Sequence, residues 1–202
     1  MKIFQCPGHG GRNRGCNHGG LYENDWTLEF SRDCGPSLMV LGAEVQLARE
    51  SDTFISYRDR AKNAEKWGAD LVLCHHINAS VYPRNHEKAG EIDPYPRGAW
   101  TMIMPGDSVG YQVGRRILQV SPNRNSLRPI RCSQSDWTAS AFGVMEPYRE
   151  KRIPVVLIEW GFATNPDERS FLKSRTHRYT LVASVVSAVA RFAELKGIPW
   201  TR

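Results

Sequence analysis

Residues 69–78 read ADLVLCHHIN, a short apolar run that ends in two histidines and an asparagine. Residues 154–162 read PVVLIEWGF, where a second apolar run, Val155–Ile158, is followed by Glu159. Leu71–Leu73 and Val155–Ile158 are continuously apolar, which is typical of central strands covered on both faces. The two runs therefore predict strands over 70–75 and 154–159 in the middle of a sheet.

Further apolar runs alternate with helical patterns along the chain, as in an α/β fold. We expect three more strands, over residues 2–6, 44–49 and 100–104. We expect helices over residues 24–34, 57–67, 107–120, from 165 onward, and 175–196. Pro36 should break or kink the first helix, because proline removes an interior donor. The prediction is one α/β domain over residues 1–202, with a mostly parallel, twisted central sheet of about six strands flanked by helices.

The composition is that of a soluble globular protein, with 202 residues, 41% hydrophobic and 24% charged. No apolar run approaches the ~18 residues of a transmembrane helix, so membrane insertion is not expected. Lys2 is followed by only two large apolar residues before Pro7-Gly8, so the start does not resemble a signal peptide. Either the protein is made without a secretory signal, or a signal has been removed.

The net charge of +6 suits an anionic partner such as nucleic acid, membrane lipid or a cell-wall polymer. No pattern of stacking aromatics or a recognition helix favours nucleic acid. The five cysteines are an odd number without a CxxC pair, which argues against a disulfide framework and a cysteine-type zinc finger.

Four candidate groups for chemistry lie where strands meet loops: His9, Glu23, His76 and Glu159. Ligands of open parallel sheets bind at the carboxyl ends of strands, where three of these groups are expected, and Glu23 opens the first helix. Two imidazoles and one carboxylate form a known catalytic zinc set. Each group also has an ordinary structural interpretation: a hydrogen-bonded histidine, or an acid that interacts with a helix dipole. An acid at the end of a buried strand needs a partner.

Five blocks of the sequence resemble the zinc-dependent N-acetylmuramoyl-L-alanine amidases of the amidase 3 type. They occur in the family's order between residue 3 and about residue 170: Pro7–Gly11, Glu23–Asp25, Arg49–Asp52, Ala69–Asn78 and Glu159–Asn165. The chain departs from the family pattern at Cys74-His75, at Glu65, at Gly35-Pro36 and in a long loop over residues 82–98.

The resemblance implies that His9, Glu23 and His76 hold one zinc ion and that Glu159 is the catalytic acid–base. It also implies hydrolysis of the amide bond between N-acetylmuramic acid and L-alanine in peptidoglycan, at the bacterial cell wall. The His-x-Asn spacing selects His76 as the ligand, and alternation along the strand places His75 on the opposite face.

Two long irregular stretches, residues 78–98 and 121–139, are candidates for substrate contact because such loops are usually functional or mobile. Five residues in them are candidates to line a groove for glycan and stem peptide: Asn78, Arg84, Tyr95, Arg124 and Arg128. An ordinary solvated loop explains the same residues.

Three alternatives remain open from the sequence. The first is another zinc amidohydrolase, such as a peptidoglycan carboxypeptidase or a deacylase. The second is a non-catalytic wall-binding module. The third is a cysteine hydrolase that pairs Cys74 with His75 or His76. The setting is either a phage endolysin or a bacterial enzyme whose signal has been removed, and a monomer is favoured.

Overall fold

A five-stranded sheet forms the centre of the computed structural model, which describes residues 1–82, 84, 86–122 and 139–197. The strand order is β4-β1-β5-β7-β6, where the first four strands are parallel and β6 is antiparallel to β7. The bounds are β1 Lys2–Pro7, β4 Glu44–Leu47, β5 Leu71–Asn78, β6 Trp100–Ile103 and β7 Val155–Phe162. This confirms the expected α/β fold with a mostly parallel sheet, which has five strands in the described residues against about six predicted.

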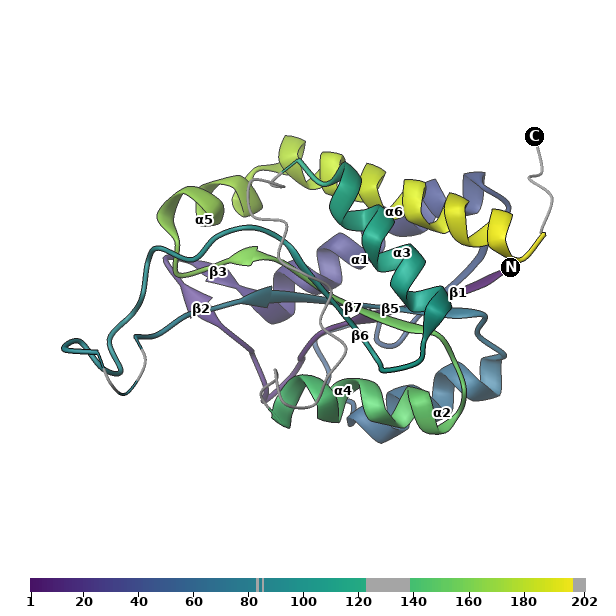
Figure 1. The fold of residues 1–202 in the computed structure, drawn as a ribbon, viewed down its shortest axis with the longest axis horizontal. Coiled ribbons are helices and arrows are strands. Elements are labelled where there is room, and N and C mark those ends of the chain that lie inside the picture. The colour runs from purple at the N-terminus through teal and green to yellow at the C-terminus, as the bar shows by residue number, and fades with distance from the viewer. Residues whose placement is uncertain (83, 85, 123–138, 198–202) are drawn as a thin grey trace.

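Helices cover both faces of the sheet (Figure 1). Helices α1, α3 and α6 lie on one face, and α2 and α4 lie on the other. The helices are α1 Glu23–Val40, α2 Tyr57–Trp67, α3 Ser108–Val120, α4 Ala139–Glu150, α5 Pro166–Lys173 and α6 Arg175–Leu195. Among the described residues, none of these helices combines the length and apolar character needed to cross a bilayer.

The side chains of the central strands alternate between two hydrophobic cores. Leu71 and Leu73 pack in the core under α1 and α6, whereas Val72 and Cys74 pack in the core under α2 and α4. Because successive side chains of a strand point to opposite faces, a continuous apolar run is what this double burial requires.

The first helix contradicts the break expected at Pro36, since α1 runs on to Val40 with Pro36 inside it. Gly35 has no Cβ, which removes part of the clash that a proline causes with the residue before it. Leu38, beyond the proline, is fully buried in the core. Burial of the far end of α1 therefore outweighs the local preference to end the helix.

Two central strands extend further than expected, and this changes the position of two site residues. β5 ends at Asn78 rather than at residue 75, and β7 ends at Phe162 rather than at residue 159. His76 thus lies within its strand rather than directly after it, and Glu159 lies within its strand rather than at its last residue. The two are Cα partners in the sheet. The ladder shifts register only between His76 and Asn78.

Three elements were not predicted: the short hairpin of β2 (Asn17–His18) and β3 (Leu21–Tyr22), and helix α4. Helix α4 contains Pro147, which weakens a helical pattern in the sequence. The last helix, in contrast, begins at Arg175 as predicted and ends one residue earlier than expected.

Asn165 links the end of β7 to helix α5, and its replacement should lower the stability of the protein. Its Oδ1 accepts hydrogen bonds from the backbone N–H groups of Asp167 and Glu168, while its Nδ2 donates to the carbonyl of Pro94 at 2.8 Å. We expect Asn165→Ala to lower the free energy of unfolding by about 1–2 kcal/mol. Asn165→Asp retains the capping oxygen and should lose less. Urea unfolding measures both, and equal losses would show that the cap contributes nothing.

Candidate metal centre

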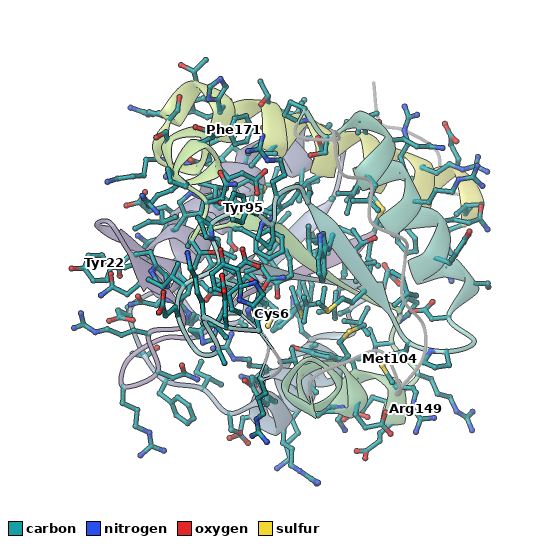
Figure 2. All side chains as sticks on the ribbon, turned by 60° about the vertical axis from the view of Figure 1, so that its left-hand side comes forward. Cys6, Tyr22, Tyr95, Met104, Arg149 and Phe171 are labelled. Carbon is teal, nitrogen blue, oxygen red and sulfur yellow. The ribbon has the colours of Figure 1, made fainter. Side chains whose placement is uncertain are left out.

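Three separate segments bring His9, Glu23 and His76 together at the carboxyl edge of the sheet. His9 lies in the turn after β1, Glu23 is the first residue of α1, and His76 lies near the end of β5. Figure 2 looks onto this edge, with Cys6 of β1 near its middle and Tyr22, the residue before α1, at its margin. The parallel order β1-β5 places the two histidine segments side by side.

The three side chains meet at one carboxylate oxygen. Oε1 of Glu23 lies 3.0 Å from Nε2 of His9 and 3.0 Å from Nδ1 of His76. The two imidazole rings pack edge to face with their centroids 5.0 Å apart. One ligand atom from each residue lies within 4.8 Å of the others, so this group could hold a metal ion.

Backbone and side-chain partners orient these groups. Oε1 of Glu23 also accepts a hydrogen bond from the N–H of Ile77 at 2.9 Å, and Oε2 accepts from the N–H of Cys16 at 2.8 Å. Nδ1 of His9 lies 2.9 Å from Oδ1 of Asn13, which leaves Nε2 facing Glu23. Partners of this kind fix the orientation of metal ligands. Asn13 was missed from the sequence, where only its spacing of four residues from His9 hints at this role.

The charges within the group stabilise one another. Burial raises the pKa of Glu23, but hydrogen bonds and charge from His76 and His9 outweigh it and hold the pKa well below its usual range. Burial likewise lowers the pKa of His9, and the hydrogen bond and charge of Glu23 reverse this to a net rise. The site thus keeps a buried carboxylate ionised and supplies two nitrogen donors and one oxygen donor, the set that suits zinc.

Glycines leave the space that this cluster occupies. A Cβ added at Gly15 would lie 2.3 Å from Oε2 of Glu23, and one added at Gly8 would lie 2.6 Å from Cε1 of His76. Both distances are shorter than real contacts allow. A close-fitting cradle around two imidazoles and one carboxylate fits a small ion with nitrogen and oxygen ligands.

Glu159 lies beside the cluster with an unsatisfied oxygen. It is the Cα partner of His76 across β5 and β7, and its Oε2 is buried without a hydrogen-bond partner within the described part of the chain. Burial, and next the negative charge of Glu23, raise the pKa of Glu159 well above its usual value. A carboxyl group whose pKa is raised in this way is suited to general acid–base work.

His75, on the opposite face, has both ring nitrogens occupied. Nε2 lies 2.8 Å from Oε1 of Gln5, and Nδ1 accepts from Nε1 of Trp160 at 3.2 Å. The ring is fully buried, and burial followed by the charge of His76 lowers its pKa to about 3. A neutral imidazole with two satisfied nitrogens has a structural role, in agreement with the prediction from strand alternation.

Cys74 is not placed to act as a nucleophile. It is fully buried in the core under α2 and α4, and burial raises the pKa of its thiol well above the usual value. Reactive cysteines are accessible and have a lowered pKa. The geometry therefore disfavours the cysteine-hydrolase alternative.

The predicted substrate residues are only partly brought near this centre. Asn78 ends β5, and its Oδ1 accepts from the next backbone N–H, that of Ala79. Arg84 is exposed, and Tyr95 is 75% exposed. Both belong to residues 79–98, described except for 83 and 85, which we call the arm and which extend beyond the strand ends (Figure 1). Arg124 and Arg128 lie outside the described residues.

The Amidase_3 family, described as N-acetylmuramoyl-L-alanine amidase, matches residues 3–191. The chain belongs to this amidase family. The match spans all four candidate site residues and, apart from Lys2, every strand of the sheet.

Known amidases are similar to this chain over most of its length. An N-acetylmuramoyl-L-alanine amidase of Bacillus licheniformis, CwlM, is 28% identical over 193 residues, which cover 95% of this chain and 68% of the relative. The germination-specific amidase of Bacillus subtilis (strain 168) is 26% identical over 203 residues, with 98% and 81% covered.

Solved structures of amidases share the fold. The amidase of Clostridium difficile 630 superimposes with a TM-score of 0.74 at 25% identity, covering 97% of this chain and 98% of that one. The catalytic domain of CwlV from Bacillus (Paenibacillus) polymyxa var. colistinus gives a TM-score of 0.77 at 21% identity, with 98% and 99% covered.

Proposed function

We propose that this protein is a zinc-dependent enzyme that hydrolyses the amide bond between N-acetylmuramic acid and L-alanine in bacterial peptidoglycan. The observation that carries the proposal is the meeting of His9, Glu23 and His76 at one buried carboxylate oxygen, beside Glu159, whose Oε2 has no hydrogen-bond partner among the described residues. Membership of the Amidase_3 family supports the choice of substrate.

One zinc ion would be held by Nε2 of His9, the carboxylate of Glu23 and Nδ1 of His76. Zinc bound at such a site acts as a Lewis acid and makes water a nucleophile at neutral pH. The ionised state of Glu23, which both histidines favour, keeps a ligand oxygen ready, and Asn13 keeps the ring of His9 oriented.

Glu159 would manage the protons of the reaction. Its Oε2 takes a proton from the attacking water and later delivers it to the nitrogen of the departing L-alanine. Its burial raises its affinity for a proton, so that this delivery does not require an acidic medium. The expected products are a glycan that ends in a lactyl group and a peptide that begins with L-alanine.

Analysis of the products tests this function. Purified protein is incubated with cell-wall sacculi, with and without a metal chelator, and the soluble products are identified by mass spectrometry. New amino-terminal L-alanine that disappears with the chelator supports the proposal. Release of D-alanine would instead indicate a carboxypeptidase, release of acyl groups a deacylase, and no product at all a wall-binding module.

The setting follows from the substrate. Peptidoglycan lies outside the cytoplasmic membrane, so we place the action of the protein at the bacterial cell wall. The net charge of +6 favours association with an anionic wall polymer. The proposed working unit is one domain, residues 1–202, acting as a monomer.

The arm would contribute to binding of the glycan and stem peptide. Tyr95, Val81 and Ile92 are 75%, 60% and 51% exposed, so the arm presents large apolar side chains to solvent. Tyr95 lies in front of the carboxyl edge of the sheet in Figure 2. Asn78, at the base of the arm, and Arg84, on the arm, would add polar contacts to the same substrate. An exposed tyrosine ring offers a polysaccharide an apolar face with a polar tip.

We expect Tyr95→Ala to raise KM for polymeric wall substrate about fivefold with little change in kcat, because loss of a stacking contact costs about 1 kcal/mol. Kinetics on solubilised wall fragments measure this change. Tyr111→Ala is the matched control. Tyr111 is also exposed, at 43%, but it lies on α3, which follows the end of β6 that is farther from the carboxyl edge of the sheet. Equal effects of the two substitutions would contradict a role for the arm.

A further inference from the structure

The turn that carries His9 has an unusual backbone. Strand β1 ends at Pro7, and φ is +58° at His9, +127° at Gly10 and +57° at Gly11. A histidine in the left-handed region is uncommon and carries a cost in free energy. Contacts around the turn must therefore hold His9 in this conformation.

Two buried arginines supply those contacts. Nη2 of Arg49 donates to the carbonyl of Gly8 at 2.9 Å, and its Nε donates to the carbonyl of Pro7 at 3.3 Å. Nη2 of Arg60 donates to the carbonyl of His9 at 2.6 Å, and its Nη1 donates to that of Pro7. The three successive carbonyls of Pro7, Gly8 and His9, at the end of β1 and just after it, thus each accept a hydrogen bond from a guanidinium group. Buried carbonyls need a donor of this kind.

Arg49 also links this turn to the helix that carries Glu23. Its Nη2 donates to the carbonyl of Asn24 at 2.6 Å and lies 3.3 Å from Oγ1 of Thr27. The same hydroxyl of Thr27 donates to the carbonyl of Gly8 at 2.9 Å. One guanidinium group and one hydroxyl therefore connect the segments that hold two of the three proposed ligands.

The placement of these two cations is costly, which indicates that their geometry matters. Arg49 is 2% exposed and Arg60 is 3% exposed. Burial, and next the charge of Arg60, lower the pKa of Arg49 to about 10, so both groups remain charged at neutral pH. Their hydrogen bonds go mainly to backbone carbonyls, which offset buried charge less well than a carboxylate does. Two positive charges also oppose a nearby metal cation, so an electrostatic attraction for the metal does not explain them.

We propose that Arg49 and Arg60 are positioning residues, which fix the turn of His9 relative to Glu23 and thereby set the affinity of the site for zinc. This inference rests on the proposed function only in taking zinc as the bound ion. The planar, forked guanidinium group suits the task, because it bonds two carbonyls at fixed directions, whereas an ammonium group does not.

Zinc affinity of lysine variants tests the inference without an activity assay. Arg49→Lys and Arg60→Lys retain the charge and lose the fork. Zinc is titrated against a chromophoric chelator, and circular dichroism with thermal unfolding of the metal-free protein verifies that each variant is folded. We expect zinc to bind about 10–100-fold more weakly, as is typical when partners of metal ligands are changed. Arg58→Lys, an exposed position in the same helix as Arg60, is the matched control and should bind zinc like the wild type.

Folded lysine variants that bind zinc with wild-type affinity would overturn the inference. If neither lysine variant folds, the same titration of Thr27→Val decides, because this substitution removes the hydroxyl between Arg49 and Gly8 at nearly constant volume. A severalfold weaker affinity supports the inference, and an unchanged affinity overturns it. Wild-type protein that binds no zinc would overturn the proposed metal centre itself, and the inference with it.

Discussion

The Glu159→Gln variant is expected to lose turnover by about 10²–10⁴-fold while it binds zinc as the wild type does. The amide of glutamine has nearly the same shape as the carboxyl group, but it does not accept and release a proton as a carboxyl group does. Glu159 lies opposite His76 in the last part of β7, and its Oε2 has no hydrogen-bond partner among the described residues, so the change breaks no hydrogen bond of that oxygen there. The fold and the metal ligands should therefore persist.

Turnover on wall fragments and zinc content by elemental analysis measure the two parts of this expectation. Glu44→Gln is the control, because Glu44 is exposed at the start of the edge strand β4. A Glu159→Gln enzyme within a few-fold of wild-type turnover would remove Glu159 from the acid–base role. A variant that loses its zinc as well would instead indicate that Glu159 is a metal ligand.

Much of the fold could be predicted because its signals are local. The apolar runs of β5 and β7 are fully buried, and burial on both faces leaves no polar alternation in the sequence. The same strand geometry separates His75 from His76, since neighbouring side chains point to opposite faces. The convergence of His9 with His76 follows from parallel pairing of β1 with β5, which places the carboxyl ends of the two strands together.

Other features depend on contacts that are distant in the sequence. The extension of α1 past Pro36 is fixed by burial of Leu38 against the core, which no local propensity reveals. The hydrogen bonds of Arg49 and Arg60 reach back 42 and 53 residues to Pro7. In the sequence, Arg49 stood out only as part of a block that resembles the family, and the role of both arginines became visible only from the turn that they hold.

The Glu23→Ala variant is expected to bind zinc more than about 10–100-fold more weakly than the wild type and to lose its amidase activity as well. A loss of about 10–100-fold is typical when a residue that only contacts a metal ligand is changed, and Glu23 is itself a proposed ligand. Glu23 supplies the oxygen at which both histidines meet. Without it, the site keeps two imidazoles but loses the negative charge that attracts a metal cation. Treatment of the wild type with a chelator should abolish activity to the same extent, and added zinc should restore it.

Thiol reagents provide the contrasting treatment in this experiment. Cys74 is fully buried, so these reagents should not inactivate the enzyme through Cys74 under conditions that keep the protein folded. Zinc titration and turnover are measured on the same preparations of wild type and Glu23→Ala. Because zinc binding and turnover depend on the same carboxylate, they should fall together. An enzyme that resists the chelator, keeps its activity without Glu23 and is inactivated by a thiol reagent would show that the chemistry at this edge of the sheet is not that of a metal ion.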